Sequence, residues 1–224
     1  MWPHTARELE DVQRELASDR SLPWTPTAAP LVGACVVRFP RGQIGPGAAG
    51  DPGWAAAVAL KDGRVIAQAT VSGAAGGPYV PGLLALREGP LLEDAVRALD
   101  VRPDVLLVDA TGRDHPRRAG LATHLGAVLG VPTVGVTHRP LAAQGEAPAE
   151  SAGSIAPLVL DGEPVGAWVR TRRGARAVAV HAGWRTDVEA AVAVVLGCAH
   201  RHRTPEPLRY ARRLARLARA HARA

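Results

Sequence analysis

The chain has 224 residues, 47% of them hydrophobic, and a formal net charge of +6. A chain of this length and composition can bury a substantial core as a single domain. No segment offers about eighteen consecutive uncharged apolar residues, and the N-terminal stretch is charged and amphipathic. We therefore expect a monomeric, cytoplasmic protein that does not enter a membrane.

The two cysteines and the basic residues are distributed unevenly. Cys35 and Cys198 are far apart in the sequence, which indicates neither a disulfide framework nor a zinc site. Residues 201–224 contain eight Arg and one Glu, so this segment carries +7 and the preceding 200 residues carry −1. We expect a domain over 1–200 and a basic helical tail over 201–224. The tail is a candidate phosphate-binding surface, and a solvated, docked or frayed helix is an equal alternative.

The predicted elements alternate between strands and helices. A Pro- and Gly-rich loop covers 40–53, and Asp62-Gly63 indicates a tight hairpin. Strands are expected near 32–38, 54–60, 64–70, 105–108, 133–136, 164–170 and 177–181. Helices are expected near 5–18, 84–99, 117–129 and 186–197, and then in the tail. This order predicts an α/β fold: a ribonuclease H-like mixed β-sheet with helices on both faces, in a single domain.

The segment that follows the apolar run 105–108 is the most informative part of the chain. Four β-favouring residues predict a buried strand, and Asp109 comes directly after it. His115, Arg117 and Arg118 follow in the loop after this strand. An acid, an imidazole and two guanidiniums at the end of a strand suggest a metal-assisted reaction on phosphate.

Three motifs together resemble the endonuclease V family of metal-dependent nucleases, which recognise inosine in DNA or RNA. They are PYVPGLLALRE at 78–88, VDATGRDHPRRAGLATHLG at 108–126 and PTVGVTHRPL at 132–141. The two prolines around Tyr79 and Val80 stiffen a loop whose aromatic tip can enter a base stack. The resemblance covers about residues 5–210 and implies a nuclease that cuts 3′ of the inosine.

The resemblance also implies roles for individual residues. Asp109 and Glu88 match acids of the metal site, where carboxylate oxygens would hold Mg²⁺ or Mn²⁺, and His115 matches a catalytic histidine beside them. Tyr79 matches the wedge that fills the space left by the extruded base. Arg117 and Arg118 would contact phosphate. The residues that match the pocket for the base are Gly82, Leu84, Ala110, Leu121 and Gly135.

Three family positions are degenerate in this chain. Cys35 stands where the family has the first-strand aspartate, and a thiol is a poor ligand for Mg²⁺. His138 aligns with a lysine, and Trp184 aligns with the histidine of a Gly-His-Arg motif. Losing one ligand of a hydrolytic metal site costs on the order of thousands-fold in rate. We therefore expect cleavage by this copy to be impaired.

Less specific interpretations remain for several of these residues. Cys35 can be a small core residue, Tyr79 a hydrophobic plug, and the two arginines can pair locally. His124 is as easily a packed histidine as a participant in catalysis. Two hypotheses follow: an endonuclease V-like nuclease with impaired activity, and a catalytically lapsed protein that binds deaminated or branched nucleic acid.

Overall fold

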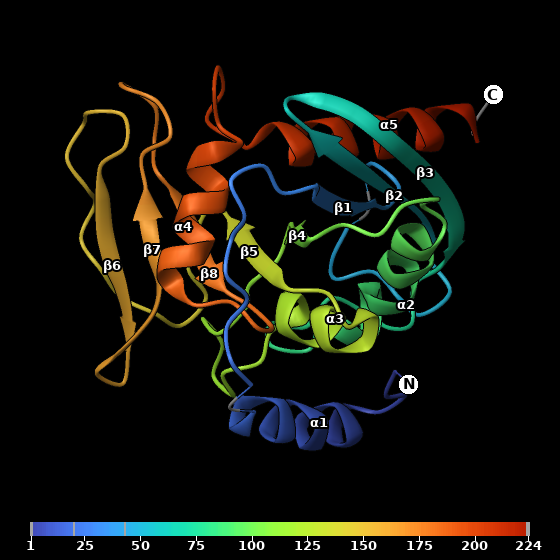
Figure 1. The fold of residues 1–224 in the computed structure, drawn as a ribbon. Helices are drawn as coiled ribbons and strands as arrows, with labels where there is room; N and C mark the ends of the chain where they lie inside the picture. Colours follow the sequence, from blue (N-terminus) through green and yellow to red (C-terminus); the bar gives the residue numbers. More distant parts are fainter. Residues whose placement is uncertain (1, 20, 43, 223–224) are drawn as a thin grey trace.

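The computed structural model describes residues 2–19, 21–42 and 44–222. The chain forms one eight-stranded sheet with helices against it (Figure 1). The strands are β1 (Val32–Arg38), β2 (Pro52–Lys61), β3 (Arg64–Ala74), β4 (Val105–Val108), β5 (Thr133–Thr137), β6 (Ile155–Leu160), β7 (Glu163–Val169) and β8 (Val178–Ala182). The helices are α1 (Ala6–Ser18), α2 (Leu84–Arg97), α3 (Leu121–Leu129), α4 (Val188–Gly197) and α5 (Glu206–His221).

The sheet is mixed, as the sequence predicts. Its strand order is β3-β2-β1-β4-β5-β8-β7-β6, so β3 and β6 form the two edges (Figure 1). The central strands β1, β4 and β5 are parallel, and their carboxyl ends therefore lie at one edge of the layer. The opening strands β1, β2 and β3 are antiparallel, and β2 and β3 are joined by a turn in which Asp62 and Gly63 both have positive φ. That geometry is the type I′ hairpin turn that Asp-Gly predicts.

Helices cover both faces of the sheet, which confirms the predicted ribonuclease H-like class. One face packs Cys35, Val37 and Leu106 against α2 and α3, with Leu9 of α1 at the margin of the same cluster. The other face packs Val36 and Leu107 against α4 and α5. Successive residues of β1 alternate between these two clusters, as the period of a strand requires.

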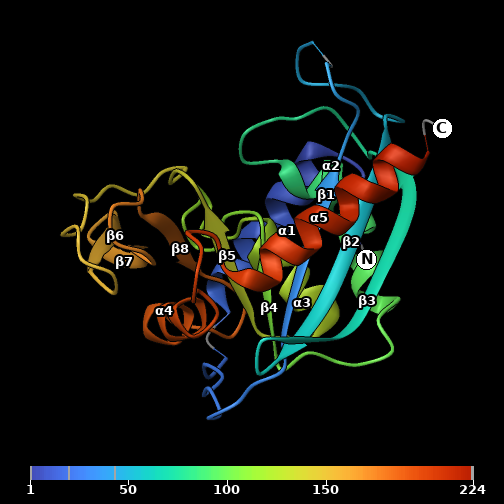
Figure 2. The same cartoon turned by 90° about the horizontal axis from the view of Figure 1, so that it is seen from above.

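The basic segment at the C-terminus contains helix α5, which is docked on the sheet. Leu208, Ala211 and Ala215 of α5 are fully buried, and the first two join the core cluster of β1, β2 and β4. Figure 2 shows α5 lying diagonally across β1 and β2. Among the alternatives for the segment 201–224, packing onto the sheet is therefore the one observed. Residues 223 and 224 lie outside the described part.

The structure corrects two of the predicted elements. Strand β6 is missing from the prediction because Pro157 argues against a strand, and proline is tolerated here because β6 is an edge strand. Helix α3 begins at Leu121 and not near residue 117. Arg118 has a left-handed φ of 56° and Gly120 is an extended N-cap, so the helix cannot start earlier. Among the described helices, none is long and apolar enough to span a bilayer.

The buried face of α5 predicts a stability difference between two leucines of the same helix. Leu208→Ala removes a fully buried side chain and should lower the free energy of unfolding by about 2 to 5 kcal/mol. Leu217→Ala is the matched control, because Leu217 is 44% exposed, and it should change stability by less than about 0.5 kcal/mol. Urea unfolding monitored by circular dichroism measures both. Equal losses would contradict the docked arrangement of α5.

Candidate functional site

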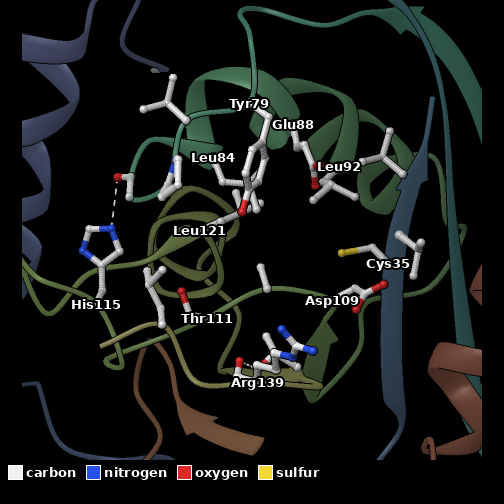
Figure 3. A pocket seen from close by; sticks show the side chains of 18 of the residues that line it. Cys35, Tyr79, Leu84, Glu88, Leu92, Asp109, Thr111, His115, Leu121 and Arg139 are labelled. Carbon is white, nitrogen blue, oxygen red and sulfur yellow. Dashed lines mark hydrogen bonds between the residues drawn. The ribbon is translucent and has the colours of Figure 1, made fainter. Parts of the chain in front are cut away.

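A cavity of about 420 Å³ opens at the carboxyl ends of β1, β4 and β5, beneath α2. This edge is where α/β proteins commonly place ligands, and the volume lies within the usual range for a small-molecule or base pocket. Figure 3 shows Tyr79, Leu84 and Glu88 on the wall formed by the 78–83 loop and α2. Cys35 and Asp109 lie on one side of the cavity, and His115 lies on the other.

The cavity brings Glu88 and Asp109 together with Cys35. Cys35 pairs in register with Val108, so its side chain lies beside the end of β4, where Asp109 follows. The Cys35 thiol is fully buried. Burial raises its pKa, and the charges of Asp109 and Glu88 raise it further, so the thiol is neutral. A neutral buried thiol cannot replace the carboxylate that the family resemblance places at this position.

Glu88 is also biased towards its neutral form. Burial, and secondarily the charge of Asp109, raise the pKa of Glu88 to about 8, while Arg38 and Arg87 oppose the shift. Arg87 is itself buried on α2 and bonded to Asp51 at 3.0 Å and to the carbonyl oxygen of Gly77 at 2.6 Å. Its guanidinium therefore ties the loop before β2 to the loop before α2. Glu88 accordingly holds a proton over most of the neutral range.

Asp109 is held by an arginine from the last helix. Arg212 of α5 donates from Nη2 to Oδ1 at 2.7 Å and from Nε to Oδ2 at 3.1 Å. Arg38 at the end of β1 adds a second guanidinium, 3.5 Å from Oδ2. Bidentate pairing of this kind occupies both carboxylate oxygens and neutralises their charge. This contact joins residues 103 positions apart, so no local sequence pattern indicates it.

These donors do not fit a hard divalent cation. Magnesium requires several ionised or neutral oxygen ligands in near-octahedral geometry. Here the carboxylate of Asp109 is already paired with Arg212, and the position of the third family carboxylate is a thiol. Within the described residues, no three His, Cys, Asp or Glu side chains gather as a metal site. The Mg²⁺ or Mn²⁺ site thus remains an implication of the resemblance, and the side-chain arrangement does not support it.

His115 positions the loop that carries Tyr79. Its Nε2 donates to the carbonyl oxygen of Gly82 at 3.0 Å, and its Nδ1 accepts from the backbone N–H of Arg117 at 3.1 Å. Burial lowers the pKa of the His115 imidazole. The buried Gln13 of α1 also donates to Gly82, at 3.1 Å. Because both ring nitrogens are engaged and His115 lies across the cavity from Asp109, the residues 88, 109 and 115 do not surround one cation (Figure 3).

Four of the five residues expected to receive an extruded base line the cavity: Gly82, Leu84, Ala110 and Leu121. Tyr79, the expected wedge, lines it as well. Tyr79 is 50% exposed, and its ring extends over the cavity in Figure 3. Gly135 lies behind the wall: a Cβ there would come within 2.4 Å of the carbonyl oxygen of Ala110. Glycine at 135 therefore permits the close approach of β5 to the chain after β4.

Both predicted phosphate contacts are engaged elsewhere. Arg117 donates to Gln13 at 2.6 Å and to the carbonyl oxygen of Gly82 at 3.2 Å. Arg118 donates to the carbonyl oxygen of Leu160 at 2.7 Å and pairs with Asp161 at 3.1 Å. The local-pairing alternative therefore describes both side chains in this structure, and phosphate contact stays a prediction.

The other degenerate positions lie outside the cavity. Trp184 follows β8 at the opposite edge of the sheet, where its Nε1 donates to Asp19 at 3.1 Å. His138 is exposed next to the cavity, and burial together with Arg203, Arg212 and Arg176 lowers its pKa. The residue from the C-terminal part of the chain that contacts Asp109 is thus Arg212 and not Trp184.

His124 is a packed histidine, because the ring of Trp2 stacks on its ring with the two centroids 4.3 Å apart.

Asp114 organises another wall of the cavity, a role that the sequence does not reveal. Its side chain is fully buried and accepts from three successive backbone N–H groups, those of Leu141, Ala142 and Ala143, at 2.7 to 2.8 Å. These bonds fix the loop that presents Arg139 to the cavity. An acid within the motif after β4 was the available signal, although its backbone partners could not be read from the sequence.

Comparison with known proteins shows which family this chain resembles. The family model described as endonuclease V matches residues 44–213. A protein named endonuclease V from Streptomyces avermitilis is 39% identical over 221 residues, which cover 97% of this chain and 93% of that protein. The crystal structure of endonuclease V from S. avermitilis superposes with a TM-score of 0.89 at 38% identity, covering 100% of this chain and 96% of that one.

A more distant structure contains nucleic acid. Ciona intestinalis endonuclease V, in complex with a 24mer DNA containing an inosine followed by a ribo-adenosine, superposes with a TM-score of 0.80 at 20% identity. The match covers 96% of this chain and 98% of that one. At this identity the likeness is one of fold.

The raised pKa of Glu88 predicts a pH-dependent stability. The unfolded carboxyl ionises near pH 4.5 and the folded one near 8, so the folded state binds more protons between these values. Stability conferred by neutral Glu88 should therefore fall as pH rises through this window, by at most about 1.4 kcal/mol per pH unit. Glu88→Gln cannot ionise and should gain stability over wild type from pH 5 to 8 in urea unfolding. Glu146→Gln, at an exposed loop position, should track wild type, and a Glu88→Gln curve parallel to wild type would contradict the shift.

Proposed function

Because the chain belongs to the endonuclease V family, a family of nucleases, we propose that it recognises inosine in DNA or RNA and that its hydrolysis of the phosphodiester 3′ of the inosine is impaired. The observation that carries the proposal is the bidentate contact of Arg212 with Asp109. The cavity lined by Gly82, Leu84, Ala110 and Leu121, here called the base pocket, stays open. The contact occupies the carboxylate of Asp109, which a hydrolytic metal would need.

Recognition is supported by the shape and lining of the cavity. Leu84, Ala110 and Leu121 offer apolar walls for a flat base, and the backbone near Gly82 is held by three side-chain donors. Tyr79 stands half-exposed at the mouth, where it can occupy the space that an extruded base leaves. The inosine-containing DNA of the Ciona complex makes such a base the first ligand to test.

Impairment is supported by the charges around Asp109. Two guanidiniums already neutralise this carboxylate, and a divalent cation would have to displace Arg212 at the cost of two charge-assisted hydrogen bonds. Cys35 supplies no compensating negative charge, since burial raises its pKa. Hydrolysis therefore lacks the negative charge that would hold a divalent cation. Recognition of the base depends instead on the residues that line the base pocket.

The same contact favours a second candidate, a catalytically lapsed protein that binds deaminated or branched nucleic acid without cutting it. The guanidinium of Arg212 beside Asp109 favours binding of nucleic acid, because it removes the repulsion between this carboxylate and an approaching phosphate. Both candidates use the base pocket for recognition, and they differ only in residual cleavage. We propose that the protein acts as a monomer in either case.

Cleavage and binding measured on the same strands distinguish these functions. With a labelled inosine strand and Mg²⁺ or Mn²⁺, the wild-type protein should cut at least about a thousandfold more slowly than the S. avermitilis relative. It should nevertheless bind the inosine strand more tightly than a matched adenosine strand in EDTA. The variant Cys35→Asp/Arg212→Ala should cut faster than Cys35→Asn/Arg212→Ala, a matched control of equal side-chain size without the charge.

Two results would contradict the proposal. Wild-type cleavage at the rate of the relative would refute impairment. Equal affinity for inosine and adenosine strands would refute recognition of the deaminated base. Residual inosine-dependent cutting by wild type supports the impaired nuclease, and binding without any cutting supports the lapsed binding protein.

A further inference from the structure

A second cavity, of about 510 Å³, lies beside the base pocket at the same edge of the sheet. We call it the arginine pocket. It is formed where β7 ends and β8 begins, next to the loop that follows β5. The residues that line it are His138, Arg139, Ala147, Trp168, Arg170, Arg176, Ala177 and Arg203. Among the residues that the structure describes, four arginines and no acid line this cavity.

The charge of these arginines is not balanced by carboxylates. Arg170 donates to the carbonyl oxygens of Pro148, Ala149 and Ala175, which fix the guanidinium without neutralising it. Arg203 is fixed in the same way, by the carbonyl oxygens of Arg176 and Ala177 at 2.7 and 2.8 Å. Among the described residues, none of the four lining arginines takes part in an ion pair.

Neighbouring positive charges repel one another here. The pKa of Arg203 is lowered by burial and by the charges of Arg176 and Arg212, which is the expected effect of crowded like charges. Arg176 and Arg139 are exposed, so both remain accessible to a ligand. Two fixed guanidiniums beside two exposed ones favour an anion, and the planar guanidinium matches the oxygens of a phosphate.

An aromatic side chain completes the pocket. Trp168 on β7 is partly buried against Leu158 and Val165, and its Nε1 donates to the carbonyl oxygen of Gly145 at 3.2 Å. This bond and the packing hold the indole in place while it lines the cavity. A rigid aromatic surface beside arginines is the combination that binds successive nucleotides of a single strand, by stacking and by phosphate contact.

We propose that the arginine pocket holds a nucleotide of the strand whose inosine enters the base pocket, with its phosphate at Arg176 and Arg139 and its base against Trp168. Arg139 lines both cavities, so a strand can pass from one to the other along this side chain. The inference rests on the proposed function only in taking nucleic acid as the ligand. It adds a subsite that binds irrespective of which base the neighbouring pocket holds.

Fluorescence anisotropy with a labelled single strand of about fifteen nucleotides tests this subsite in EDTA. Arg176→Ala should weaken binding roughly fourfold at 0.15 M salt and reduce the salt slope by about 0.7, the value for one lost phosphate contact on a single strand. Arg173→Ala is the matched control, because Arg173 is an exposed arginine in the same connection between β7 and β8 and does not line the pocket. It should bind as wild type does.

Substitutions at the tryptophan test the stacking contact. Trp168→Leu should lose about tenfold in affinity, and Trp168→Phe should recover most of it, since a phenyl ring also stacks. Circular dichroism establishes that both variants remain folded. Equal affinities and slopes for Arg176→Ala and Arg173→Ala would overturn the inference, and so would a Trp168→Leu variant that binds as tightly as wild type.

The design separates this inference from the proposed function. Arg176→Ala should weaken binding of the inosine strand and of the adenosine strand by the same factor. The ratio of the two affinities therefore reports on the base pocket alone. If wild type shows no preference for inosine, the proposed function fails, and the comparison of Arg176→Ala with Arg173→Ala still decides the subsite.

Discussion

The ion pair between Asp109 and Arg212 joins the fold to the chemistry of the cavity. Asp109 follows the central strand β4, and Arg212 lies one helical turn after the buried Leu208 of α5, at the border of the face that packs into the core. The last helix of the chain therefore places a fixed positive charge at the position where the family resemblance calls for a cation. Because α5 packs across β1 and β2, this charge cannot leave without disturbing the sheet or swinging the whole side chain into solvent.

Separate sets of contacts hold the two sides of the cavity. The apolar walls of the cavity and the loop of Tyr79 are held by contacts around Gly82, which involve Gln13, His115 and Arg117. None of these contacts uses Asp109. Positive charge extends from Arg212 to the arginine pocket, so the surface around the cavity suits a phosphodiester backbone even though the carboxylates no longer suit a metal.

Local sequence signals predicted most of the fold and part of the site. The apolar run before Asp109 and the Asp62-Gly63 turn gave a strand and a hairpin because each depends on neighbouring residues alone. Strand β6 was missed because tolerance of Pro157 depends on its being at an edge, which is a property of the assembled sheet. Arg212, Gln13 and Asp114 were missed for a similar reason: their partners are distant in sequence, and only the packing of α5, α1 and the loop after β5 brings them together.

The most direct test of the Arg212 contact is the binding of Mn²⁺, measured by electron paramagnetic resonance in the absence of nucleic acid. The wild-type protein should bind the ion with a dissociation constant above about 1 mM. Cys35→Asp/Arg212→Ala restores an acid and removes the competing guanidinium, and should bind at least about tenfold more tightly; adding Asp109→Asn should abolish that gain. Tight binding of Mn²⁺ by wild type that is lost in Asp109→Asn would show that the metal displaces Arg212 readily, and would contradict the account.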